Sequence, residues 1–247
     1  MLVLLPPSEG KATRRRGAPV DLASLSFPEL TPARTRVLEA LTETSRRPDA
    51  LAVLDVGASL AAEVEANTRL LRAPTLPAQD LYDGVLYDAL DLASLPPGAK
   101  RRAGTRVLVA SALWGVLRPG DRVPPYRLSM GVDLPGAGPL AAFWRSHLPA
   151  VLDEAAAGHL VVDCRSATYA ASWRPAGGAV AVRVLRDQDG RRSVVSHMAK
   201  HTRGLVTRHL LQRPGRDPRT PAQLAAAVGE AFEVELDGDT LDVVVRG

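Results

Sequence analysis

The sequence predicts an α/β protein with a mixed sheet flanked by helices. Three short apolar runs have the length and composition of buried strands: Met1–Leu5, Val107–Ala110 and His159–Cys164. Stretches with helical spacing of apolar residues separate them, and this alternation is typical of α/β sheets. With 247 residues, of which 46% are hydrophobic, the chain is long enough for a sizeable core. We therefore predict one domain over residues 1–247.

Prolines mark the helices expected in the first half of the chain. Thr31 and Pro32 begin a helix that runs to about Thr44, with the threonine as N-cap and the proline at the first helical position. Two further helices are expected, at Ser59–Leu71 and Asp91–Arg102. The second contains two prolines, so it should be short or broken.

The sequence of the second half of the chain predicts three helices and two hairpins. The helix over Pro139–Ala157 is interrupted at Pro149, a second helix covers Met198–Gln212, and a short one begins at Thr220. Turns that contain glycine, at 187–190 and 237–239, join the hairpin strands. Those strands are Val180–Arg186 with Arg192–His197, and Phe232–Leu236 with Leu241–Val245.

Composition excludes several classes of protein. No apolar run reaches the roughly 18 residues that span a bilayer, and no basic segment precedes Met1–Leu5, so we expect no membrane partner and a cytoplasmic location. The single cysteine, Cys164, excludes an internal disulfide and is expected to be a core residue. His197 and His201 have a helical ligand spacing but lack the glutamate of HExxH and a third ligand. We expect no metal and no cofactor.

The segment Ser111–Gly131 has the composition of a binding site. It follows the strand Val107–Ala110, so it leaves the sheet at the carboxyl edge, where open α/β sheets place their ligands. Its prolines fix φ and remove backbone donors, which stiffens the loop. The candidate ligand-binding or catalytic side chains that it carries are Arg118, Asp121, Arg122, Tyr126 and Arg127.

The three lysines stand out in a chain where arginine is the usual cation: Lys11, Lys100 and Lys200. Lys11 ends a loop that begins at Ser8, directly after the first strand. This Gly-Lys pair is not a Walker loop, because the preceding glycine and the following Ser or Thr are missing. Two interpretations stay open: an anion site made by Ser8, Lys11 and free backbone N–H groups, or a polar loop without a ligand.

Lys200 and Arg203 lie near the start of the predicted helix Met198–Gln212. Positive side chains are unfavourable there for the helix itself, which indicates a ligand, although a solvated face explains them as well. Ser166 or Tyr169, which follow another strand, could contribute to the same crevice.

Several segments together resemble the peroxide-stress protein YaaA family. They are Val3–Lys11, Leu81–Leu90, Ser111–Gly131 with its LWGVLRPxDxxxPYRLxMG pattern, Phe143–Trp144 and Ala199–Leu205. The resemblance implies a cytosolic protein with one α/β domain and a positively charged cleft. It also implies DNA binding through an element similar to a helix-hairpin-helix, and a link to lowering free iron under hydrogen peroxide.

Individual positions carry this resemblance, and some positions depart from it. The matching positions are Ser8, Lys11, Tyr82, Gly84, Gly115, Arg118, Pro119, Asp121, Pro125, Tyr126, Arg127, Met130, Gly131, Lys200, Arg203 and Gly204. The first loop reads PPSEGKA where other members tend toward SPAKT, Trp114 replaces a common tyrosine, and the C-terminal segment is shorter. The change in the first loop allows a different ligand.

The sequence and the resemblance lead to two candidate functions of different classes. In the first, the chain is a peroxide-stress protein that binds DNA in a sequence-independent way, with the Leu113–Val116 turn presenting backbone amides to phosphates. The basic side chains of this cleft are Arg118, Arg122, Arg127, Lys200 and Arg203.

In the alternative, the same region encloses a small phosphorylated or nucleobase-bearing substrate. Stiff proline-rich loops and rare lysines favour such a closed pocket, in which carboxylates serve as general bases. The ligand-binding candidates are Ser8, Lys11, Tyr82, Gly115, Arg118, Arg127 and Arg203, and the catalytic candidates are Lys200, Tyr126 and Asp121. Neither function predicts an oligomeric state.

Overall fold

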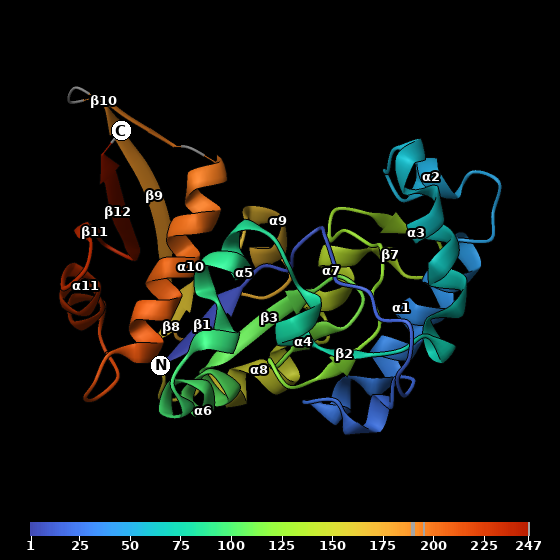
Figure 1. The fold of residues 1–247 in the computed structure, drawn as a ribbon, viewed down its shortest axis with the longest axis horizontal. Coiled ribbons are helices and arrows are strands. Elements are labelled where there is room, and N and C mark those ends of the chain that lie inside the picture. Colours follow the sequence, from blue (N-terminus) through green and yellow to red (C-terminus); the bar gives the residue numbers. More distant parts are fainter. Residues whose placement is uncertain (189–190, 195, 247) are drawn as a thin grey trace.

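A mixed sheet forms the centre of the molecule (Figure 1). The structure is a computed structural model that describes residues 1–188, 191–194 and 196–246. Its eight-stranded sheet has the order β11 (Glu233–Asp237), β12 (Thr240–Arg246), β9 (Val180–Gln188), β8 (Val161–Asp163), β1 (Leu2–Leu5), β3 (Val107–Ser111) and β4 (Gly115–Leu117), with β10 (Arg191–Val194) paired to β9.

The directions of these strands confirm the predicted mixed α/β sheet. From β12 through β9, β8 and β1 to β3 all neighbours are parallel, whereas β4, β10 and β11 pair antiparallel. Every residue of β1 and β3 is buried, with Leu4 paired to Leu108. Continuous apolar strands such as these are typical of parallel sheets that are covered on both faces.

Two small sheets and the helices surround this centre. The small sheets pair β2 (Leu76–Pro77) with β5 (Arg122–Val123) and β6 (Asp133–Leu134) with β7 (Gly138–Pro139). The helices are α1 (Thr31–Thr44), α2 (Ala50–Val53), α3 (Ala61–Ala66), α4 (Ala78–Leu81), α5 (Val85–Leu90), α6 (Pro97–Arg106), α7 (Leu140–Arg145), α8 (Pro149–Ala156), α9 (Ala167–Ala170), α10 (Ser196–Gln212) and α11 (Pro221–Gly229).

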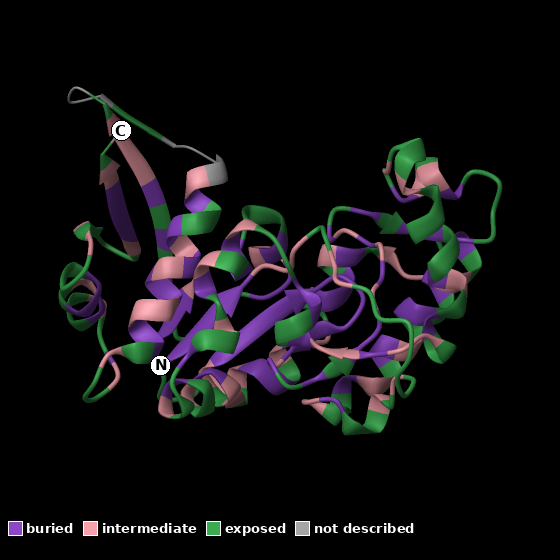
Figure 2. Cartoon of the chain, viewed as in Figure 1, coloured by how far each residue is buried: buried purple, intermediate pink, exposed green. Residues whose placement is uncertain are grey.

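The elements are distributed along one long axis. Figure 1 shows α1, α2 and α3 at one end of the molecule and β11, β12 and α11 at the other, with β1 and β3 between them. Figure 2 shows the central strands and the inner sides of the helices as buried, while exposed residues concentrate on the outlying helices and loops. Within the described part of the chain, no helix is both long and apolar enough to cross a membrane.

Close packing of α10 on α5 depends on a glycine. A Cβ atom on Gly204 would meet the Leu86 carbonyl oxygen and would lie 2.9 Å from the Ala89 Cβ atom. The backbones of the two helices therefore approach more closely than any larger residue allows. This contact fixes the position of α10 beside α5.

Most helix predictions are confirmed, with one correction at a cap. The helix Thr31–Thr44 is α1, but Thr31 is not an N-cap, because a 3-10 turn at Pro28–Leu30 runs directly into the helix and Leu30 occupies that position. Thr220 does cap α11, since its hydroxyl accepts a hydrogen bond from the Gln223 N–H at 3.2 Å. The predicted helix at 59–71 is a succession of 3-10 and α turns.

The other predicted breaks and hairpins are also present. The proline-containing segment 91–102 is broken into a 3-10 turn, Leu92–Ser94, followed by α6, and the helix over 139–157 divides into α7 and α8. Both hairpins form, as β9 with β10 and β11 with β12, although residues 189 and 190 of the first turn lie outside the described residues. The predicted strand Arg192–His197 is too long, because β10 ends at Val194 and α10 begins at Ser196.

Candidate functional site

The order of the strands creates a crevice between β1 and β8. The chain passes from β1 to β3 on one side, and later crosses to β8 on the other side of β1. The loops that follow β1 and β8 therefore separate at the carboxyl edge of the sheet. In open α/β sheets, ligands bind at such a topological switch point.

A pocket of about 390 Å³ opens at this crevice. This volume lies in the range of small-molecule sites. Four segments line the pocket: the loop after β1, the start of α5, the turn after β8, and α10. Its lining residues are Pro6, Pro7, Ser8, Glu9, Gly10, Asp83, Gly84, Val85, Leu86, Tyr87, Ser166, Tyr169, Lys200 and Arg203.

Two cations hold the loop after β1 by its carbonyl groups. Lys11 Nζ donates to the Ser8 carbonyl at 3.0 Å and to the Glu9 carbonyl at 3.4 Å, and it lies 4.4 Å from the centre of the Tyr126 ring. Arg127 Nη1 donates to the same Glu9 carbonyl at 2.9 Å. Burial lowers the pKa of Lys11 to about 8, because the ammonium has lost much of its hydration. Lys11 thus shapes the loop and does not line the pocket.

Ser8 joins the loop after β1 to the start of α5. Its hydroxyl donates to the Gly10 carbonyl and accepts a hydrogen bond from the Asp83 N–H at 3.1 Å. Both functions of the hydroxyl are occupied. Glu9 and Asp83 also bring two carboxylates to this part of the pocket, and the side chains of Ser8 and Lys11 bond to main-chain groups. These contacts do not favour the anion site expected from Ser8 and Lys11.

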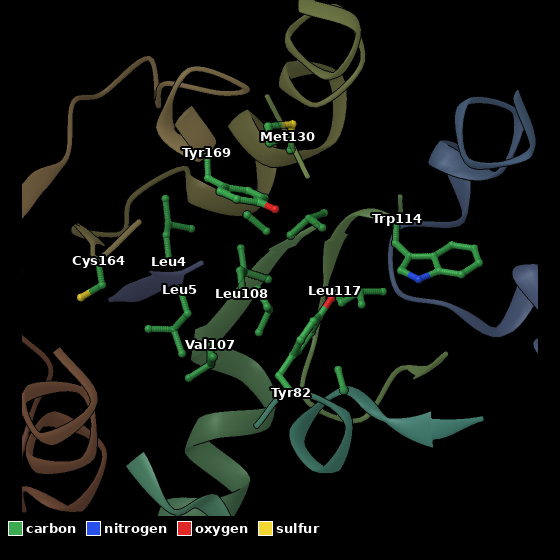
Figure 3. Close-up of a cluster of buried hydrophobic side chains, with 14 of the residues drawn as sticks. Leu4, Leu5, Tyr82, Val107, Leu108, Trp114, Leu117, Met130, Cys164 and Tyr169 are labelled. Carbon is green, nitrogen blue, oxygen red and sulfur yellow. The ribbon is translucent and has the colours of Figure 1, made fainter. Parts of the chain in front are cut away.

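Tyr82 and Tyr126 belong to a buried hydrogen-bonded group beneath the loop. Their hydroxyls lie 3.0 Å apart, and that of Tyr126 lies 2.7 Å from Ser111 Oγ. Figure 3 shows Tyr82 among the apolar side chains beside β3. Burial raises the pKa of Tyr82 to about 12 and raises that of Tyr126 well above its ordinary value. The structure places these two predicted site residues behind the pocket wall.

Two other tyrosines do line the pocket. Tyr87 stacks on Tyr82 with ring centres 5.5 Å apart, and its hydroxyl donates to the Pro6 carbonyl at 2.7 Å. Tyr169 follows β8 in α9, and Figure 3 shows it close to Met130. Both rings are largely buried, and burial raises the pKa of both hydroxyls. The tyrosines therefore supply neutral, apolar surface to the pocket.

Lys200 and Arg203 supply the positive charge of the pocket. They lie one helical turn apart on α10, so both side chains reach the same side of the helix. Arg203 Nε donates to the Val182 carbonyl at 3.0 Å, which orients the guanidinium. Within the described residues, neither Lys200 Nζ nor the terminal nitrogens of Arg203 have a hydrogen-bond or ion-pair partner. These donors are available to a ligand.

Three predicted residues of the Ser111–Gly131 segment lie elsewhere. Arg118 donates to the Thr105 carbonyl at 2.7 Å and packs over the ring of Phe27. Asp121 is buried and accepts hydrogen bonds from Ser26 and from the Arg118 N–H, at 2.8 to 2.9 Å. The third, Arg122, donates its side chain to a main-chain carbonyl at 3.0 Å. The single cleft expected to contain all the arginines is therefore not present.

The turn at Leu113–Val116 is not the helix-hairpin-helix element that the resemblance implied. Gly115 begins the buried strand β4 and pairs with Ser111 of β3, so this turn belongs to a β-hairpin. A Cβ atom on Gly115, whose φ is +72°, would lie 2.6 Å from the Trp144 ring. The strand amides face the sheet and the core, not solvent. The prediction that they contact phosphates was wrong.

Several contacts that shape the site had no signal in the sequence. Asn67 is fully buried and holds the main chain of Arg127, whose guanidinium also lies 3.6 Å from the carboxylates of Glu9 and Glu63. Arg34, on α1, is also fully buried and donates to four main-chain carbonyls.

Neither Cys164 nor any histidine whose side chain the structure describes lines the pocket. Cys164 is a core residue, as predicted, and burial raises the pKa of its thiol to about 12. Among the described residues, no group of three or more His, Cys, Asp or Glu side chains could hold a metal ion. The side chain of His197, one of the two spaced histidines, lies outside the described part of the chain.

The fold and the pocket define an α/β protein with a small-molecule-sized site at the switch point of a mixed sheet. Comparison with known proteins then gives the family. The family model described as peroxide stress protein YaaA matches residues 1–236, and the chain belongs to this family.

Its relatives are UPF0246 proteins of similar length. A UPF0246 protein of Streptomyces coelicolor is 50% identical, covering 100% of this chain and 99% of its own length. One from Corynebacterium efficiens is 44% identical, covering 99% of this chain and 100% of its own length. Another, from Cereibacter sphaeroides, is 33% identical, with 100% of this chain and 99% of the relative covered.

Proposed function

We propose that this member of the peroxide stress protein YaaA family binds a small phosphorylated compound in the pocket between β1 and β8 and acts on it as an enzyme. The observation that carries the proposal is the pair of donors on α10. Lys200 and Arg203 line the pocket at the switch point, and within the part of the chain that the structure describes neither forms an ion pair with a protein carboxylate. A lysine point charge and an arginine fork together suit a phosphate group.

The apolar part of the lining supports a ligand with a planar or apolar portion. Tyr87, Tyr169 and the prolines after β1 offer such a surface beside the two cations. A nucleotide combines a phosphate with a planar base, so it fits this class of ligand.

The acid or base of such an enzyme would come from the pocket lining itself. Glu9 and Asp83 are the carboxylates that line the pocket, whereas Asp121 and Tyr126 are buried and hydrogen-bonded elsewhere. The proposal therefore assigns general acid or base work to Glu9 or Asp83. It assigns binding and charge stabilisation to Lys200 and Arg203.

Calorimetric titration with AMP, adenosine and inorganic phosphate tests this proposal. AMP and phosphate should bind, and adenosine, which lacks the phosphate, should bind more weakly than AMP. Lys200→Met should abolish the binding of both anions, whereas Lys100→Met, a change at an exposed residue of α6, should leave it unchanged. Equal binding of AMP by the two variants would rule out the α10 site.

DNA binding is the second candidate function. The resemblance to the family motivates it, and one structural feature favours it: Arg14, Arg15 and Arg16 are consecutive and exposed. Such a contact would be made by phosphates and would weaken steeply with salt. Fluorescence anisotropy with a labelled duplex at about 50 and 200 mM salt tests it, with the triple Arg→Gln variant as comparison. An affinity that stays constant over this range would exclude a phosphate-dominated interface.

The remaining expectations rest on the composition of the chain and on the same resemblance. A role in the peroxide-stress response, a cytoplasmic location and a single domain over residues 1–247 are part of the proposal. Growth of a deletion strain under hydrogen peroxide, with and without the Lys200→Met variant supplied in trans, connects the pocket to that role.

A further inference from the structure

The charges that line the pocket are separated by sign. Both cations, Lys200 and Arg203, belong to α10. Both carboxylates, Glu9 and Asp83, belong to the two loops that Ser8 joins, since the Ser8 hydroxyl accepts a hydrogen bond from the Asp83 N–H at 3.1 Å. The pocket therefore has a positive part and a negative part.

These opposite charges do not neutralise each other. Within the described residues, neither Glu9 nor Asp83 forms an ion pair with Lys200 or Arg203. The Glu9 carboxylate instead lies 3.6 Å from Arg127 Nη2, and the side chain of Glu9 is 59% exposed. The Asp83 side chain is exposed as well. These four residues and the apolar wall line one pocket of about 390 Å³ that opens to solvent.

A ligand with one negative group would satisfy only part of this lining. Its phosphate would be attracted by α10 and repelled by the two carboxylates, because both kinds of charge line the same pocket. A ligand that also carries a positive group would turn that repulsion into an attraction. A pocket with complementary charge at both ends would bind such a molecule more tightly than an analogue that lacks the positive group.

We propose that the ligand of this pocket is a small zwitterion, with an anionic phosphate or carboxylate held by Lys200 and Arg203 and an ammonium group held by Glu9 and Asp83. This inference rests on the proposed function for its anionic end, and adds the cationic end. The ammonium would donate to the two carboxylates, which are the acceptors that line that part of the pocket. Ser166 and the tyrosine wall would contact the portion between the two charges.

A pair of matched probes tests the cationic end by itself. Phosphoethanolamine and ethyl phosphate carry the same phosphate ester, and only the first carries an ammonium group. In calorimetric titrations, the parent protein should bind phosphoethanolamine at least about 10-fold more tightly than ethyl phosphate, as expected for a charge-assisted hydrogen bond. Asp83→Asn and Glu9→Gln should reduce this preference.

A control variant accounts for the general effect of removing an acidic residue. Asp88→Asn makes the same change of charge on the exposed face of α5, five residues from Asp83 and outside the pocket lining, and should keep the full preference. Thermal melting of each variant shows whether it is folded.

The outcomes separate the two proposals. If the parent binds both probes equally, or ethyl phosphate more tightly, the zwitterion is excluded while the phosphate site stands. If Asp88→Asn lowers the preference as much as Asp83→Asn does, the effect is one of overall charge and the zwitterion is again excluded. If neither probe binds, the anion site on α10 is itself overturned.

Discussion

The side chain of Asn67 forms two reciprocal hydrogen bonds with the main chain of Arg127. Asn67 Nδ2 donates to the Arg127 carbonyl, and the Arg127 N–H donates to Asn67 Oδ1, both at 2.9 Å. Asn67 is fully buried, so water cannot replace either bond. The Arg127 guanidinium then reaches the Glu9 carbonyl at 2.9 Å. A residue far from the pocket in sequence thus helps to fix the loop that lines it.

Replacing Asn67 should therefore destabilise the whole protein. Asn67→Ala leaves the partly buried N–H and carbonyl of Arg127 without their partners, at a cost of about 2–4 kcal/mol. Urea unfolding measures this loss. Thr68→Ala, which removes only the hydrogen bond from an adjacent hydroxyl to the Glu65 carbonyl, should cost less than about 1 kcal/mol. Equal stability of Asn67→Ala and the parent would contradict the assigned role of Asn67.

The lowered pKa of Lys11 gives the stability of the protein a pH dependence above pH 8. Burial lowers this pKa from 10.5 to about 8 in the folded chain, so between these values the unfolded chain holds a proton that the folded chain has lost. Stability should therefore rise with pH across this window, by on the order of 1–3 kcal/mol. Below pH 8 both states hold the proton and the dependence disappears.

Comparison with an untitratable side chain isolates this effect. Urea unfolding of the parent and of Lys11→Met at several values between pH 7 and 10.5 gives the difference in unfolding free energy between them. This difference should change in favour of the parent as the pH rises through the window. A constant difference would show that the ammonium of Lys11 is not desolvated in the fold.

Two glycine-to-alanine changes should act in opposite directions. Gly204→Ala places a methyl group against the Leu86 carbonyl and the Ala89 side chain, so it should push α10 away from α5 and destabilise the protein by about 1–3 kcal/mol. Gly104→Ala, inside α6 with no atom within 4 Å of the new Cβ, should stabilise it by about 0.5–1 kcal/mol. Thermal unfolding of both variants and the parent measures these two changes in stability. Stabilisation by both changes would mean that the two helices do not pack so closely.

The fold was more predictable from the sequence than the site. Apolar runs located β1, β3 and β8, and prolines located the breaks between helices, because both signals are local. The same signals found the strand ends from which the pocket loops begin. Ser8, Lys200 and Arg203 were proposed on this basis, and the structure brings these three to one pocket.

The arginines of the Ser111–Gly131 segment show what local signals miss. Arg118 and Arg122 have the composition and position of ligand residues, but their donors go to carbonyls of segments that are distant in sequence, at Thr105 and Thr75. Arg34 is satisfied by the protein in the same way. Its buried guanidinium donates to the carbonyls of Trp114 and Val116 in the β3–β4 hairpin, which is distant in the sequence. Only the tertiary structure shows whether an arginine is satisfied by the protein or free for a ligand.

We propose that Lys200 binds a ligand and does not stabilise the fold. Thermal melting of the parent, Lys200→Met and Lys100→Met, each with and without inorganic phosphate, distinguishes these two roles. Without phosphate, the midpoint of Lys200→Met should equal that of the parent or exceed it slightly, because the lysine has no partner among the described residues and lies near a helix N-terminus, where a cation costs about 0.3–1 kcal/mol. Phosphate should raise the midpoints of the parent and of Lys100→Met and leave that of Lys200→Met unchanged. A Lys200→Met protein that unfolds well before the parent, or that gains as much stability from phosphate as Lys100→Met does, would contradict the account.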